Sequence, residues 1–109
     1  MTRHLARPAG QICLAPEYLL CREEIMPALE ASLVRAMQEA FGKDPKNSPD
    51  LARMVSCEDV DRIASSVSKT KGRILCGGEF DRATRYVAPT IISCCPLSDP
   101  IMQVSPFRL

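Results

Sequence analysis

Two stretches of this sequence are candidate strands: Arg73-Ile74-Leu75-Cys76-Gly77-Gly78 and, after a polar turn, Tyr86-Val87-Ala88-Pro89-Thr90-Ile91-Ile92. Both contain β-branched residues, which favour strands, the second also has the aromatic Tyr86, and both are bounded by glycine, proline or polar residues. We therefore predict one strand over residues 73–76, ended by the two glycines. A second strand is predicted over residues 86–92, before Cys94-Cys95-Pro96.

A helix is predicted on the N-terminal side of these strands. Glu23 and Glu24 stand at its start, where the helix dipole favours negative charge, and Pro27 is tolerated only in a first turn. Gly42 is a typical residue to end it. Its apolar positions follow the helical period: Leu29, Leu33, Ala36, Met37, Ala40 and Phe41. The polar residues 43–50 that follow include two prolines and are predicted to form a surface loop.

A second helix is predicted after that loop. Ser56 and Asp59 have the spacing of a capping box, in which the serine accepts a hydrogen bond from the backbone of the later residue. Gly72 stops this helix. Its apolar stripe consists of Val60, Ile63, Ala64 and Val67.

Residues 18–21 are mostly apolar and follow Pro16, which interrupts any helix, so they are predicted to form a short buried strand. The predicted order is strand, helix, helix, strand, strand, which is typical of an α/β fold. Three short strands, with Pro89 inside the last, make an incomplete sheet whose exposed edges invite pairing with another chain.

Length and charge exclude several classes of protein. The chain has 109 residues, of which 46% are hydrophobic and 25% charged, close to the globular average. Its 14 basic and 13 acidic residues give a net charge of +1, so no nucleic-acid surface or basic membrane patch is expected. A chain of this length is also too short for most complete cofactor-dependent enzymes.

Six cysteines are present, at positions 13, 21, 57, 76, 94 and 95. The N-terminus lacks the apolar run of a signal peptide, and no stretch is long and apolar enough for a transmembrane segment. We therefore expect an intracellular, cytoplasmic protein whose cysteines are reduced. No CxxC pair exists and His4 is the one histidine, so no metal site is predicted. Cys94 and Cys95 are interpreted as two ordinary thiols rather than a strained vicinal disulfide.

The sequence Gly10-Gln11-Ile12-Cys13-Leu14-Ala15-Pro16-Glu17-Tyr18 leads to a more specific hypothesis. It resembles the active-cysteine segment of the aldehyde dehydrogenase superfamily, and most closely the class 3 and fatty aldehyde dehydrogenase branch. The resemblance continues in order through Phe41-Gly42, residues 44–53, Gly77-Gly78 and residues 85–90. It implies a partial catalytic domain over residues 10–103, with divergent tails at residues 1–9 and 104–109.

This resemblance implies that Cys13 is a catalytic nucleophile whose backbone N–H helps to hold the oxyanion. In the family, a cysteine thiolate adds to an aldehyde, the thiohemiacetal loses hydride to NAD or NADP, and water cleaves the resulting thioester to a carboxylic acid. Taken without the resemblance, Cys13 is interpreted as a small buried hydrophobe rather than a nucleophile, because nothing local marks a lowered thiol pKa.

Several parts that the resemblance requires are not found in this sequence. It has no strand, glycine-rich turn and helix unit for a dinucleotide, no glutamate general base and no acid to hold the cofactor ribose. We therefore expect a truncated chain without a cofactor-binding domain. By itself it should bind no NAD or NADP and should show no dehydrogenase turnover.

Two alternatives remain for the isolated chain. In the first, Cys13 is a reactive thiol that needs no cofactor. In the other, the chain is a non-catalytic module that docks on full-length subunits, or on a second copy of itself, through its unpaired strand edges. Three other candidates have simple structural explanations: Glu23 and Glu24 start a helix, Gly77-Gly78 forms a turn rather than a phosphate loop, and His4 is solvent-exposed.

Overall fold

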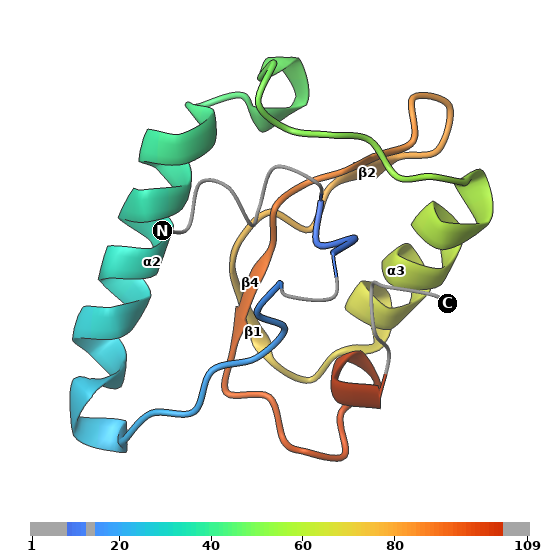
Figure 1. Ribbon diagram of the computed structural model, residues 1–109. Helices are drawn as coiled ribbons and strands as arrows, with labels where there is room; N and C mark the ends of the chain where they lie inside the picture. The colour runs from blue at the N-terminus through green and yellow to red at the C-terminus, as the bar shows by residue number, and fades with distance from the viewer. Residues whose placement is uncertain (1–8, 13–14, 104–109) are drawn as a thin grey trace.

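The computed structural model describes residues 9–12 and 15–103 (Figure 1). Two helices flank a set of short strands: α2 packs beside β1 and β4, and α3 lies on the other side against β2 and β3. In chain order the elements are η1 (Glu23–Ile25), α2 (Met26–Phe41), η2 (Pro45–Asn47), α3 (Cys57–Lys69), β1 (Arg73–Cys76), β2 (Phe80–Asp81), β3 (Tyr86–Val87), β4 (Ile91–Ser93) and η3 (Pro100–Gln103). This mixture of helices and incomplete sheets confirms the predicted α/β class.

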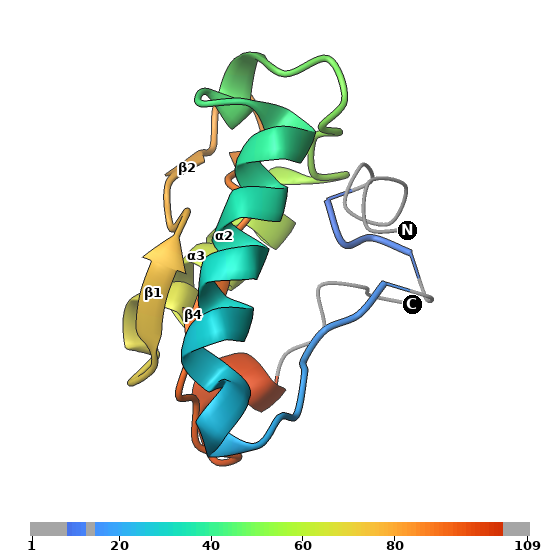
Figure 2. The same ribbon diagram turned by 90° about the vertical axis from the view of Figure 1, so that its left-hand side faces the viewer.

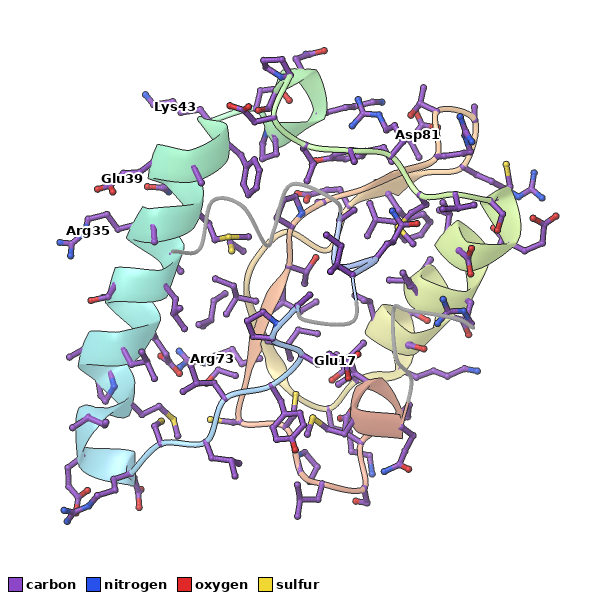
Figure 3. All side chains as sticks on the ribbon, viewed as in Figure 1. Glu17, Arg35, Glu39, Lys43, Arg73 and Asp81 are labelled. Atoms are coloured by element: carbon purple, nitrogen blue, oxygen red, sulfur yellow. The ribbon has the colours of Figure 1, made fainter. Side chains whose placement is uncertain are left out.

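Helix α2 ends at Gly42 as predicted, but it begins at Met26, and Glu23 and Glu24 lie in the preceding turn η1. Pro27 stands in its first turn, and Gly42 caps the other end with a φ of 77° while its N–H donates to the Gln38 carbonyl at 2.9 Å. Figure 3 shows that Arg35 and Glu39 point away from the strands. The helix therefore presents a charged outer face and packs its opposite face on the strands.

The capping box at the start of α3 is confirmed. Ser56 Oγ accepts a hydrogen bond from the Asp59 backbone N–H at 3.1 Å and donates one to the Asp59 carboxylate at 2.7 Å. Val60 is fully buried, and Ala64 on the same face is buried as well. The helix ends at Lys69, three residues before Gly72.

The strands form two antiparallel pairs rather than one continuous sheet. Strand β1 pairs with β4, so that Arg73 lies opposite Ser93 and Ile74 opposite Ile92, with a bulge before Cys76. Strand β2, which was not predicted from the sequence, pairs with β3. Along the chain, β2 and β3 both lie between β1 and β4, so the pair β2–β3 is nested inside the pair β1–β4.

The predicted single strand over residues 86–92 is wrong, because residues 88–90 separate β3 from β4. Pro89 has no N–H to donate to a ladder. The Thr90 hydroxyl accepts from the Gly78 N–H at 3.0 Å and donates to the Ala88 carbonyl at 2.8 Å. The turn at Gly77 approaches so closely that a Cβ there would lie 2.3 Å from the Pro89 carbonyl oxygen. These contacts redirect the chain from one strand pair to the other.

The predicted buried strand over residues 18–21 is also wrong. These residues have no regular secondary structure, and Tyr18, Leu19 and Leu20 are 63%, 60% and 79% exposed. In Figure 2 the segment runs along the side of the molecule opposite β1. Among the described residues no strand pairs with it, so its apolar side chains have no layer to pack against. We call residues 15–22 the arm.

The core consists of one apolar cluster and several buried side chains around it. Phe41, Leu51, Tyr86 and Ala88 form the cluster, and Met37 and Ala40 of α2 pack against it. Met54 and Val60 are also buried, at 1% and 0% exposure. No helix among the described residues is long and apolar enough to cross a lipid bilayer.

A buried carboxylate fixes the C-terminal turn η3. Asp99, 2% exposed, accepts hydrogen bonds from the backbone N–H of Lys71 at 2.7 Å and of Ile101 at 3.0 Å. Burial raises the pKa of Asp99, but these hydrogen bonds and one from Thr70 outweigh it, so its pKa is below the ordinary value. The charged form of Asp99 therefore joins η3 to the start of β1.

Candidate active-site segment

The proposed nucleophile Cys13, with its neighbour Leu14, lies outside the described residues, as does His4. The residues on either side are described, and the Ala15 N–H donates to the Ile12 carbonyl at 2.9 Å. We therefore describe how the residues beside Cys13 and Leu14 are held to the rest of the molecule.

Gln11 holds this segment to a loop more than forty positions away along the chain. Its Nε2 donates to the Arg53 carbonyl at 3.1 Å, and its Oε1 accepts from the Val55 N–H at 2.9 Å. One side-chain amide thus satisfies a backbone acceptor and a backbone donor of the same loop. We call residues 53–55 the anchor loop.

The anchor loop is itself held on its other side. The Met54 N–H donates to the Arg85 carbonyl at 2.9 Å, and Arg85 Nη1 donates to the Val55 carbonyl at 3.1 Å. Arg85 has a φ of 54°, which is uncommon for a residue other than glycine. Gln11 therefore attaches the candidate segment to a loop that is fixed by both hydrogen bonds and the buried Met54 side chain.

Arg53 connects the anchor loop to the core. Its guanidinium lies 5.0 Å from the centre of the Tyr86 ring, and its Nη2 donates to the Lys46 carbonyl. Nη1 of Arg53 is buried with no hydrogen-bond partner among the described residues. Burial raises the pKa of Tyr86, with help from Glu79 and Asp44 and against the effect of Arg53. Tyr86 therefore stays a neutral aromatic partner for the cation.

A second cation also faces the Tyr86 ring. Lys46 Nζ lies 5.9 Å from the ring centre and 2.8 Å from a carboxylate oxygen of Asp81, which is labelled in Figure 3. The hydrogen bond from Lys46, followed by that from Thr84, lowers the pKa of Asp81 from 3.8 to about 2. The ion pair joins η2 to β2 and closes the core near Tyr86.

The other five cysteines are free thiols. Cys57 begins α3, and its Sγ donates to the Arg82 carbonyl at 3.5 Å. Cys76 lies on β1 at the wall of a cleft of about 580 Å³ between α2 and the strands, beside Phe41 and Tyr86. Burial raises the pKa of the Cys76 thiol, which makes it a poor nucleophile near neutral pH.

Cys94 and Cys95 are two separate thiols, as predicted. Cys94 Sγ lies 3.8 Å from Met26 Sδ on α2, whereas Cys95 Sγ lies 3.9 Å from the Thr70 hydroxyl at the end of α3. The two adjacent side chains thus contact opposite parts of the fold.

Two further kinds of site, a metal site and a dinucleotide site, can be looked for among the described residues. These residues contain no group of three or more His, Cys, Asp or Glu side chains that could hold a metal ion. Gly77 and Gly78, both with positive φ, link β1 to β2, and no helix follows them directly. A dinucleotide needs a helix N-terminus after such glycines for its pyrophosphate, and Gly77 and Gly78 are not followed by one.

The sequence matches the model of the aldehyde dehydrogenase family over residues 1–107. The chain therefore belongs to the aldehyde dehydrogenase family. Aldehyde dehydrogenase family 3 member B1 from Bos taurus is 38% identical over 95 residues, which cover 87% of this chain and 20% of that protein. Beta-apo-4'-carotenal oxygenase from Neurospora crassa is 35% identical over 99 residues, which cover 91% of this chain and 19% of that protein.

A solved structure gives the same assignment. The substrate-bound state of Staphylococcus aureus AldH is similar with a TM-score of 0.85 and 31% identity, covering 91% of this chain and 22% of that one. The chain spans about a fifth of the length of the curated relatives. The predicted resemblance to this family, including its class 3 branch, is confirmed.

The residues that hold the candidate segment in place were not predicted from the sequence. Gln11 was noted as part of the motif but without a role, and neither Arg53 nor Arg85 was singled out. No local pattern marks them, because their partners are distant in sequence. Asp99 had a usable signal, since an aspartate directly before Pro100 is typical of the start of a helical turn.

Proposed function

We propose that this chain carries the nucleophile of an aldehyde-oxidising enzyme, and that Cys13 is that nucleophile within a catalytic part spanning residues 10–103. Family membership supports the reaction class. One observation supports the choice of this segment: Gln11, two residues before Cys13, makes two hydrogen bonds with the anchor loop. A nucleophile needs fixed backbone on which to meet its substrate, and the anchor loop provides a rigid attachment.

In the proposed chemistry the thiolate of Cys13 attacks the aldehyde carbon. A carbon–sulfur bond forms, the carbonyl electron pair moves to oxygen, and the product is a thiohemiacetal. The backbone N–H of Cys13 is proposed to stabilise that oxygen, a contribution of about 3 kcal/mol for one well-placed donor. Oxidation to the thioester also requires a hydride acceptor, which NAD or NADP supplies. Water then cleaves the thioester to the carboxylic acid and restores the thiol.

We assign no residue of this chain to the cofactor, because the glycine pair at residues 77–78 is followed by β2 and not by a helix. The 109-residue chain alone is therefore expected to bind no NAD or NADP and to produce no NADH or NADPH from a medium-chain aldehyde. Steady absorbance growth from the reduced cofactor, lost in Cys13→Ser, would contradict this part of the proposal.

The nucleophile itself is tested without a cofactor. 4-Nitrophenyl acetate transfers its acetyl group to a thiolate and releases 4-nitrophenolate, so the reaction needs no hydride acceptor. We expect Cys13 to be acetylated at least about tenfold faster than any other cysteine, as measured by peptide mass mapping after short exposure. Cys13→Ser should abolish the fast phase, and Cys21→Ser should leave it unchanged.

Gln11→Ala separates positioning from folding in the same assay. It should slow acetylation of Cys13 while leaving the slow acetylation of the other cysteines unchanged. Equal acetylation of all six cysteines in the parent chain would show that Cys13 is not activated. An unchanged Cys13 rate in Gln11→Ala would show that the anchor loop has no part in the chemistry.

A second candidate function is docking on full-length subunits, and the exposed arm favours it. Tyr18, Leu19 and Leu20 are apolar, exposed and without regular secondary structure, and a segment of this kind can add to a sheet edge as an extended strand. Co-purification with an intact family member, reduced by Leu20→Lys but not by Glu23→Lys, would support docking. Equal recovery of both variants would exclude the arm as the docking surface.

A further inference from the structure

Two sulfur atoms and a hydroxyl converge where α2 begins and β4 ends. Cys94 Sγ lies 3.8 Å from Met26 Sδ, and Ser93 Oγ lies 3.9 Å from Met26 Sδ and 3.5 Å from Cys94 Sγ. Met26 is separated from the other two residues by more than sixty positions in sequence, so the fold creates this triangle. Cys94 is exposed, and the group can be reached from solvent.

The triangle holds more lone pairs than hydrogens. The Ser93 hydroxyl donates its hydrogen to the Glu30 carboxylate, which Arg73 Nη2 also contacts at 2.7 Å. The thiol hydrogen of Cys94 is then the one hydrogen left among the three atoms. The Cys94 thiol donates this hydrogen to Met26 Sδ.

The size of the triangle suits a bound ion. A point equidistant from three atoms with these separations lies about 2.2 Å from each, close to the roughly 2.3 Å of a metal–thiolate bond. Thiolate and thioether are soft donors, which select monovalent copper over harder cations, and the neutral hydroxyl completes a three-coordinate set. Neither methionine nor serine belongs to the His, Cys, Asp and Glu groups that describe the commoner metal sites.

We propose that Met26, Ser93 and Cys94 form a binding site for Cu(I). The ion bonds to Cys94 Sγ and displaces the thiol hydrogen, which leaves as a proton, while Met26 Sδ donates a lone pair. Copper stays in the Cu(I) state and no electron is transferred. Ser93 keeps its hydrogen bond to Glu30, which orients its free lone pair toward the ion. This site is independent of Cys13 and of the proposed aldehyde chemistry.

The test is an anaerobic titration of the 109-residue chain with Cu(I), with bicinchoninate as the competing chromophore. We expect Cys94→Ser and Met26→Leu each to weaken the tightest site at least about tenfold. Cys95→Ser and Met37→Leu are matched controls, the neighbouring cysteine and a second methionine of α2, and should stay within about threefold of the parent chain. Far-UV circular dichroism checks that each variant is folded.

A second measurement decides the question in the parent chain. The five methionines give separate methyl carbon signals in an NMR spectrum, and Met26→Leu identifies the Met26 signal. One equivalent of Cu(I) should shift the Met26 methyl and leave that of Met37 in place. An unmoved Met26 methyl would overturn the proposal. So would a Met26→Leu affinity equal to the parent's, or a Cys95→Ser loss as large as that of Cys94→Ser.

Discussion

The anchor loop and the arm are both irregular stretches, yet they differ in almost every physical respect. The anchor loop buries Met54 and exchanges hydrogen bonds with Gln11 and Arg85. The arm leaves Tyr18, Leu19 and Leu20 largely exposed. The contrast shows that apolar sequence becomes core only where another surface lies opposite, and that irregular backbone becomes rigid when its polar groups are satisfied by the rest of the fold.

The largest expected effect comes from removing the buried side chain of the anchor loop. Met54→Ala should lower the free energy of unfolding by about 2–5 kcal/mol, because it leaves a cavity in a site that is 1% exposed. Val55→Ala, at the next position but 74% exposed, should change it by less than about 0.5 kcal/mol. Urea denaturation followed by circular dichroism measures both. Equal losses would mean that the anchor loop is not packed as described.

The connection between the candidate segment and the anchor loop is tested next. Gln11→Ala removes two hydrogen bonds and should cost about 1–3 kcal/mol of unfolding free energy. Amide hydrogen exchange should show loss of protection at Val55, whose N–H donates to Gln11.

Gln11→Glu tests which half of the Gln11 amide, the acceptor or the donor, holds the segment. A carboxylate still accepts from the Val55 N–H but cannot donate to the Arg53 carbonyl. Protection at Val55 should therefore persist in Gln11→Glu and disappear in Gln11→Ala. Loss in both variants would point to the donor side of the amide as the part that holds the segment.

A smaller effect is expected from acid. The folded-state pKa of Asp81 is about 2, against an ordinary value of 3.8, so the charged form stabilises the fold. This contribution is complete above the ordinary pKa and is lost as the pH falls through the folded value. Asp81→Asn should therefore be less stable than the parent at about pH 5 and approach it at about pH 2. A stability difference that grows on acidification would contradict the Lys46–Asp81 pairing.

The smallest effect is expected in the arm. Leu20→Ser should alter unfolding free energy by less than about 0.5 kcal/mol, because Leu20 is 79% exposed. Urea denaturation of Leu20→Ser and of Met54→Ala in parallel measures the smallest and the largest expected loss of unfolding free energy. A loss above about 1 kcal/mol would show that the arm packs on the molecule in solution.

Much of the fold could be predicted from sequence, because its signals are local. The helix ends at Pro27 and Gly42 and the cap at Ser56 depend on residues within a few positions of one another. The prediction of a strand in the arm failed because an apolar run does not indicate whether a partner strand is present. The strand over residues 86–92 failed because its interruption depends on Gly77, which approaches it from another turn.

The candidate site was predictable only in part for the same reason. The motif around Cys13 led to the family, which the comparisons confirm, although the role of Cys13 remains a proposal. The contacts of Gln11 with residues 53–55, and of Arg85 with the same loop, join positions at least thirty residues apart. No spacing rule anticipates such contacts, since they are set by tertiary packing.

The nesting of β2–β3 inside β1–β4 bears on the order in which the chain assembles. The inner pair closes over four residues, Arg82, Ala83, Thr84 and Arg85, so it requires little loop-closure entropy. Once formed, it shortens the effective loop that joins the outer strands. Since each doubling of a loop adds about 0.6 kcal/mol, the outer ladder then closes at lower cost. Low contact order of this kind favours rapid folding of the strand region, with the ladder growing outward from the turn at Arg85.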